Sequence, residues 1–114
     1  MTSELFVDII RERVVERTIK SIKENIAKPL RRNPDKDLVS MSDWYKSLNA
    51  DNKGMADKII EKSVKSGLFT FLCLLDGVIA FEDIDKGELK LYYEKADTKL
   101  LINDENKIVL HDQL

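Results

Sequence analysis

The sequence predicts a small α+β domain, with N-terminal helices packed on a small C-terminal antiparallel β-sheet. Two long stretches with helical spacing of apolar residues occupy the first two-thirds of the chain. After residue 77 the pattern changes to short apolar runs separated by turn residues, which is typical of β-hairpins. The chain has 114 residues, of which 43% are hydrophobic, and this composition suffices for a single domain with its own core.

The first helix is expected over residues 1–28, with Ser3 as its N-cap and a proline directly after it. Its apolar residues change side midway. One set comprises Phe6, Ile9, Ile10 and Val14, and the other comprises Val15, Ile19, Ile22 and Ile26. This pattern indicates a helix that bends, or one whose N-terminal end packs outside the domain. In the second case Phe6, Ile10 and Val14 are candidates for a dimer or partner face. In the alternative, the rest of the chain covers both ends.

A polar connector is expected over residues 29–41, followed by helices over residues 42–77. Ser42 is expected to cap a short helix, and a longer helix follows from about residue 52 to residue 75. Trp44 in the short helix is expected to complete the core. Tyr45 beside it is a candidate either for the core or for a partner contact, because aromatic residues are common interface anchors.

The second half of the long helix is apolar on all sides from Gly67 to Leu75, whereas the preceding turns carry lysines on one side. A helix that is apolar all round is buried, so the first helix and the hairpins are expected to wrap this segment from two sides. Cys73 within it is expected to be an inert, buried residue. Gly67 costs about 1 kcal/mol relative to alanine, which is tolerable where another backbone approaches closely.

The last segment, residues 78–114, is expected to form β-hairpins. Residues 78–81 have the composition of a short strand, and residues 88–94 alternate between apolar and polar. The apolar runs 100–102 and 107–110 flank a four-residue loop, which predicts a hairpin between them.

Charge is unevenly distributed along the chain, whose net charge is −2. Residues 1–34 carry a net +3 and residues 76–114 a net −5, an asymmetry that either steers partners or reflects solvated faces. The candidates for partner binding are Tyr45, Glu82, Asp83, Asp85, Glu88 and Tyr92. Their acidic members suit the basic cleft of a nuclease-type toxin. Nucleic-acid binding is not expected, because glutamates interleave with the basic residues of the first helix.

The residue types needed for common chemistry are absent or scattered. One cysteine and one histidine do not make a zinc site of the usual composition, and the four glycines are not clustered as in a phosphate-binding loop. No acidic turn has the spacing of a calcium-binding loop. We therefore expect no catalytic site, metal or cofactor. With no signal peptide, no disulfide framework and no membrane-spanning run, the sequence predicts a cytoplasmic protein.

Several segments in a fixed order carry a resemblance: residues 42–48, 68–77, 89–93, 101–104 and 110–112. Over about residues 42–112 the chain resembles a group of short bacterial proteins of uncharacterised function. Short bacterial proteins of this general type include immunity proteins, which bind a toxin and block it. The resemblance therefore implies a protein partner but assigns no functional residues.

These observations favour a non-enzymatic protein-binding module, whose most specific form is an immunity-type inhibitor of a bacterial toxin. Two alternatives stay open. One is a small-ligand-binding protein or enzyme with a pocket between the long helix and the sheet, where Asp76 and His111 would be the polar groups. The other is a structural or regulatory homodimer formed through the first helix.

Overall fold

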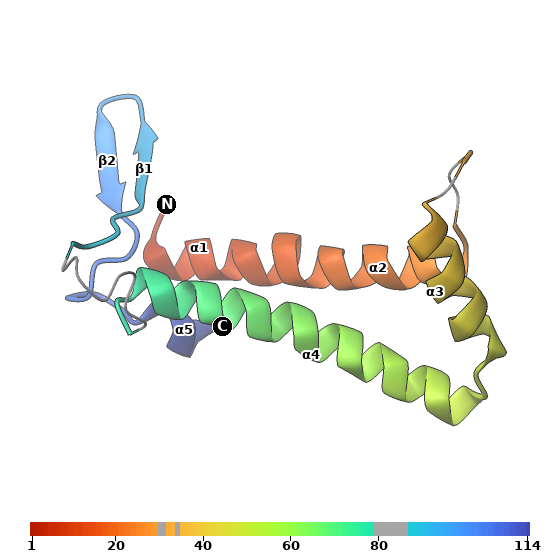
Figure 1. Cartoon of the computed structure of the whole chain (residues 1–114). Helices are drawn as coiled ribbons and strands as arrows, with labels where there is room; N and C mark the ends of the chain where they lie inside the picture. The colour runs from red at the N-terminus through yellow and green to blue at the C-terminus, as the bar shows by residue number, and fades with distance from the viewer. Residues whose placement is uncertain (30–31, 34, 79–86) are drawn as a thin grey trace.

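Two long antiparallel helices dominate the structure, a computed structural model that describes residues 1–29, 32–33, 35–78 and 87–114 (Figure 1). A third helix lies at one end of the pair, and a small β-hairpin with a short helix lies at the other. In chain order the elements are α1 (Ser3–Ile9), η1 (Ile10–Glu16), α2 (Arg17–Ala27), α3 (Lys36–Ser47), α4 (Ala50–Leu75), β1 (Tyr92–Lys95), β2 (Thr98–Leu101) and α5 (Leu110–Gln113). The predicted α+β architecture is confirmed.

The first long helix begins one residue earlier than the sequence indicated. Thr2 is its N-cap, and the Thr2 hydroxyl oxygen accepts a hydrogen bond from the backbone N–H of Leu5 at 3.0 Å. Ser3 lies within the helix and is buried, and its hydroxyl donates to the carbonyl oxygen of Ile102 at 2.7 Å. The prediction that Ser3 caps the helix is therefore wrong, because the chain after the hairpin covers this hydroxyl and takes its hydrogen bond.

The middle of this helix is wound differently from its two ends. Residues Ile10–Glu16 form a π-helix, whose hydrogen bonds reach one residue further than those of an α-helix. In an uninterrupted α-helix the eight steps from Val7 to Val15 would leave the two side chains about 80° apart. The wider turns of η1 remove most of this offset, and both valines are buried.

Helix α3 includes part of the segment that we expected to be a connector. It begins at Lys36, and Asp35 is its N-cap. The Asp35 side chain accepts a hydrogen bond from the N–H of Asp37 at 3.4 Å. Ser42 is therefore an interior helical residue and not a cap, and it is buried. Trp44 is 58% exposed, so its predicted place in the core is wrong.

Helix α4 runs for 26 residues from the N-cap Asn49, and Gly77 follows its end with a positive φ of 77°, as a helix-terminating glycine should. Its apolar second half is only partly covered. Val7 of the first helix and Ile102 and Leu110 of the C-terminal segment pack with Leu72 and Leu75, so the two expected parts of the chain do contact it. Phe69 and Phe71, however, are 45% and 49% exposed, so the prediction that this segment is buried on all sides is wrong.

The β-structure of the described residues is one hairpin, in which Tyr92 pairs with Leu101 and Lys95 with Thr98. The second predicted hairpin is absent from residues 100–110, because residues 100–101 belong to β2 and a helix, α5, begins at Leu110. The carboxylate of Asp76 accepts the first backbone N–H groups of α5 and so favours a helical turn there. The strand predicted for residues 78–81 falls largely outside the described residues.

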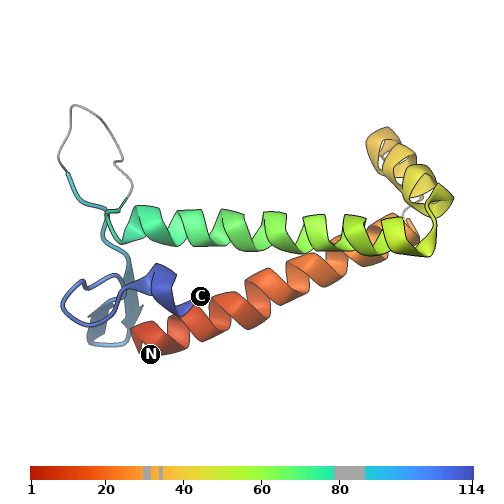
Figure 2. The ribbon, with the colours of Figure 1, turned by 90° about the horizontal axis from the view of Figure 1, so that it is seen from below.

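The hydrophobic core lies at the hairpin end of the molecule. It comprises the buried residues Val7, Leu72, Leu75, Ile102 and Leu110. The radius of gyration is 18.3 Å, whereas a compact chain of this length has about 13 Å. The molecule is therefore elongated, and both long helices extend well beyond the core (Figures 1 and 2).

Candidate functional site: a groove between the two long helices

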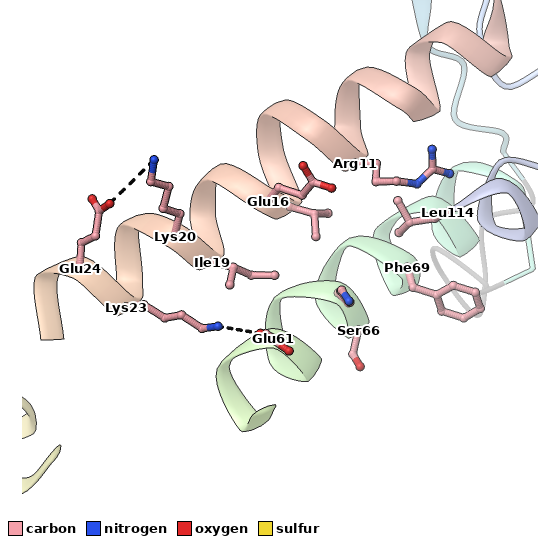
Figure 3. A pocket seen from close by; sticks show the side chains of 12 residues that line it. Arg11, Glu16, Ile19, Lys20, Lys23, Glu24, Glu61, Ser66, Phe69 and Leu114 are labelled. Atoms are coloured by element: carbon pink, nitrogen blue, oxygen red, sulfur yellow. Dashed lines mark hydrogen bonds and ion pairs between the residues drawn. The ribbon is translucent and has the colours of Figure 1, made fainter. Parts of the chain in front are cut away.

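An open groove of about 820 Å³ lies between η1–α2 and α4 (Figure 3). Its floor is apolar and comes from both sides, with Val15 and Ile19 on the first helix, Phe69 on α4, and Leu114 at the chain end. Charged side chains surround this floor: Arg11, Glu16, Lys20, Lys23, Glu24, Glu61 and Lys65. The groove thus joins an apolar surface to a rim that carries both signs of charge.

The π-helical segment supplies one wall of the groove. Arg11, Val15 and Glu16 all belong to η1, and Ile19 follows one turn later. π-Helical turns are rare in proteins and occur frequently at functional sites, because their wider winding redirects side chains. The change of winding that aligns Val15 with the core side also places this residue on the groove floor.

An ion pair joins the two walls toward one end of the groove. Lys23 Nζ on α2 donates to Glu61 Oε1 on α4 at 2.6 Å. The hydrogen bond to Glu61 raises the pKa of Lys23, and the same bond lowers the pKa of Glu61. Lys20 and Glu24 form a looser pair at 4.0 Å on the outer side of α2. The Lys23–Glu61 contact fixes the spacing of the two helices at this point.

Helix α5 closes the opposite end of the groove. Arg11 donates to the carbonyl oxygen of Gln113, and Leu114 then reaches the groove floor. The ring of His111 packs edge-on against Phe69, with 5.5 Å between the ring centroids. Two of the four apolar floor residues therefore depend on α5 and the residue after it: Leu114 itself, and Phe69 through its contact with His111.

Asp76 holds this chain end in place. Its carboxylate oxygens accept the N–H groups of Leu110 at 3.1 Å and His111 at 2.9 Å, and His111 Nδ1 lies 2.6 Å from Oδ2. The Asp76 side chain is only 8% exposed. These contacts bring together the two polar groups that the enzyme hypothesis named. Both carboxylate oxygens are engaged in holding α5, and neither residue lines the groove.

The three sequence-predicted partner-binding residues that the structure describes, Tyr45, Glu88 and Tyr92, do not form one surface. Tyr45 is half-buried on α3, where its hydroxyl donates to Asp57 at 3.1 Å and Lys53 lies over its ring. Partial burial raises the pKa of Tyr45, and the hydrogen bond to Asp57 raises it further. Tyr92 is exposed at the other end of the molecule, beneath Lys99, and Glu88 is exposed before β1. Glu82, Asp83 and Asp85 lie outside the described residues.

The dimer-face candidates of the first helix are all partly covered. Phe6 packs against the core, and Ile10 and Val14 are half-buried. The groove residues Ile19 and Phe69 were not singled out as site residues, because helical periodicity assigns each to an apolar side of its own helix. Only the antiparallel pairing of the helices shows that they share one groove.

Within the described ranges no group of three His, Cys, Asp or Glu residues could hold a metal ion. No helix among the described residues is long and apolar enough to cross a membrane. Comparison with protein-family models, curated proteins and solved structures found no match. The function is therefore argued from the groove alone.

Proposed function

We propose that this protein is a non-enzymatic protein-binding module whose groove holds an amphipathic helix of its partner. The observation that carries the proposal is the groove itself, which has an apolar floor supplied by two helices and a charged rim. Grooves of this kind bind helices that present apolar anchors at positions i, i+3, i+4 and i+7.

The composition of the groove favours a polypeptide over a small molecule. Small-molecule sites enclose most of their ligand and use only a few polar groups. This groove is open along its length, and seven of the twelve residues that line it are charged. Such a rim matches the polar side of a bound helix better than it matches a small apolar ligand.

The dimensions of the groove set the length of the bound helix. Lys23 marks one end and Arg11 the other, twelve residues apart on the first helix, which corresponds to about 18 Å. A partner helix of about three turns fills that distance. The paired rim charges leave no excess of either sign: Lys23 pairs with Glu61, Lys20 with Glu24, and Arg11 with Asp8 at 2.8 Å, which leaves Lys65 and Glu16. A partner helix that carries both signs of charge on its polar side is therefore favoured.

The test uses a library of helical peptides with randomised apolar anchors, selected for binding to the whole protein. We expect peptides with an i, i+3 or i+4, i+7 apolar pattern, and we expect Ile19→Glu to weaken their binding at least about tenfold by placing a charge on the floor. Thr18→Glu is the matched control, because it adds the same charge to an exposed position of α2 outside the groove. Circular dichroism is used to check that both variants fold.

Two results would contradict the proposal. One is a selection that yields no binding peptide with this pattern. The other is binding that Ile19→Glu and Thr18→Glu affect equally. Inhibition of a toxin is the narrower form of the proposal, and it is tested separately by co-expression with a toxin encoded beside this gene. Failure of protection there would remove the immunity role and leave the groove proposal in place.

A further inference from the structure

A second surface, on a different side of α4 from the groove, carries no charge. We define this uncharged face as Ile59, Ser63, Gly67, Thr70 and Phe71, which follow one another at steps of four, four, three and one residues. All five are exposed, Ile59 at 61% and Phe71 at 49%. Of the lysines of α4, Lys58 and Lys65 lie on the opposite side of the helix, Lys62 flanks the face beside Ile59, and Lys53 lies beyond its N-terminal end. In Figure 2 the first helix lies along one side of α4, and no described element runs along the middle of the other.

Gly67 lies at the centre of this face and leaves it without a side chain there. It is exposed, and a Cβ built at its position would meet nothing within 4 Å; Gly54, on another side of α4, has the same open surroundings. A glycine inside a helix is unfavourable relative to alanine, but it permits a close approach to the backbone. On the uncharged face, Gly67 would allow a helix of another molecule to pack closely against α4.

The chain exposes enough area to supply an interface with another molecule. The chain exposes 8749 Å², whereas a folded monomer of 13.2 kDa is expected to expose about 6,400 Å². The excess is about 2,300 Å², and a stable interface of standard size buries about 800 Å² on each partner. The long helices therefore offer more than the area that one dimer interface needs, and the uncharged face is its apolar part on α4.

The geometry points to a second copy of this chain, packed antiparallel on the uncharged face around a two-fold axis at residue 65. In that register Ile59 meets Phe71 of the second copy, and Ser63 meets Gly67 of the second copy. The two smallest residues then lie at the centre, where the helices approach most closely, and large apolar residues fill both ends. An isologous interface must be complementary to itself in this way.

A second copy is also favoured over a foreign partner by charge. The uncharged face offers nothing that would select a charged surface, and the chain carries a net charge of only −2, so two copies repel each other weakly. The resulting assembly is a four-helix bundle made of two helical pairs, in which α4 of each copy is central. The groove lies on another side of α4, so this inference does not rest on the proposed function.

Sedimentation analysis of the full chain tests the inference, with Gly67→Glu and Gly54→Glu as a matched pair. Both glycines are exposed on α4 with open space at the Cβ position, so both variants are expected to fold. The wild-type chain and Gly54→Glu are expected to sediment as dimers. Gly67→Glu is expected to weaken association by about a hundredfold, because it opposes two carboxylates near the axis.

Circular dichroism checks that the helix content of both variants matches the wild type. A wild-type chain that stays monomeric at high concentration would overturn the inference. So would a dimer that Gly67→Glu weakens no more than Gly54→Glu does. Assembly into species larger than a dimer would overturn it as well, because an isologous interface closes at two copies.

Discussion

Replacing Asp76 with alanine is expected to release the C-terminal helix and to destabilise the whole domain. The carboxylate accepts two backbone N–H groups and lies 2.6 Å from His111 Nδ1, and its side chain is 8% exposed. Hydrogen bonds to a charged group contribute about 1.5–3 kcal/mol each, but backbone groups at the start of α5 regain part of this from water. We therefore expect Asp76→Ala to lower the free energy of unfolding by about 3 kcal/mol.

The loss reaches the core because Leu110, the first residue of α5, is fully buried there. Urea unfolding followed by circular dichroism measures the change, with Asp112→Asn as the control. Asp112 lies 3.4 Å from His111 Nε2 but its side chain is 67% exposed, so its loss is expected to cost less than about 0.5 kcal/mol. If Asp76→Ala also changed the free energy of unfolding by less than about 0.5 kcal/mol, α5 would not be anchored as described.

Three further predictions concern α2, α3 and α4. Ser42→Ala is expected to stabilise the protein by about 0.5–1 kcal/mol in urea unfolding, because the buried Ser42 hydroxyl has no hydrogen-bond partner among the described residues. A loss of stability would indicate that this hydroxyl has a partner. Trp44→Ala is expected to cost less than about 1 kcal/mol, since this side chain is 58% exposed, and a cost near the 3–5 kcal/mol of a buried tryptophan would refute its exposure. Glu61 has a lowered pKa, so the Lys23–Glu61 pair contributes stability above the ordinary pKa of a glutamate and loses it as pH falls through the lowered value. The free energy of unfolding of Glu61→Gln, measured across the acid pH range, is therefore expected to depend less on pH than that of the wild type. An equal pH dependence in the two proteins would contradict the pairing.

The sequence predicted the fold class and the long helices because their apolar periodicity is a local property. Both long helices occupy the expected ranges to within a few residues, and the helix end at Gly77 was identified from the chemistry of the glycine. Local pattern also suggested that the first helix has two faces. The π-helical winding that reconciles them involves hydrogen bonds along the backbone, and no residue type encodes it uniquely.

The C-terminal region was less predictable because contacts from distant residues decide its structure. Residues 107–110 have the apolar composition of a strand, but Asp76, more than thirty residues earlier, accepts the N–H groups at the start of α5. The position of Trp44 was also not predictable from local pattern, and here burial was predicted but exposure is found. Its large apolar ring predicts burial, whereas the main cluster of buried residues lies at the hairpin end of the molecule and Trp44 is 58% exposed.

The groove could not be predicted from one sequence, since its floor combines residues of η1, α2, α4 and the chain end. Val15, Ile19 and Phe69 belong to apolar stretches of their helices, and a face that packs inside the molecule has the same pattern as a face that binds a partner. The uncharged face of α4 was partly visible in advance, because the loss of charged residues after Lys65 is plain in the sequence. That loss was taken as a sign of burial within one chain, and the exposure of Phe71 shows that it is not.

The position of a bound helix on this protein is the most direct test of the proposed protein-binding function. A selected helical peptide is titrated into isotopically labelled protein, and changes in the amide and methyl resonances are mapped onto the structure. The account predicts the largest changes at Val15, Ile19 and Phe69, with little change at β1–β2. Changes centred on the hairpin or on α3, with the groove resonances unmoved, would contradict it.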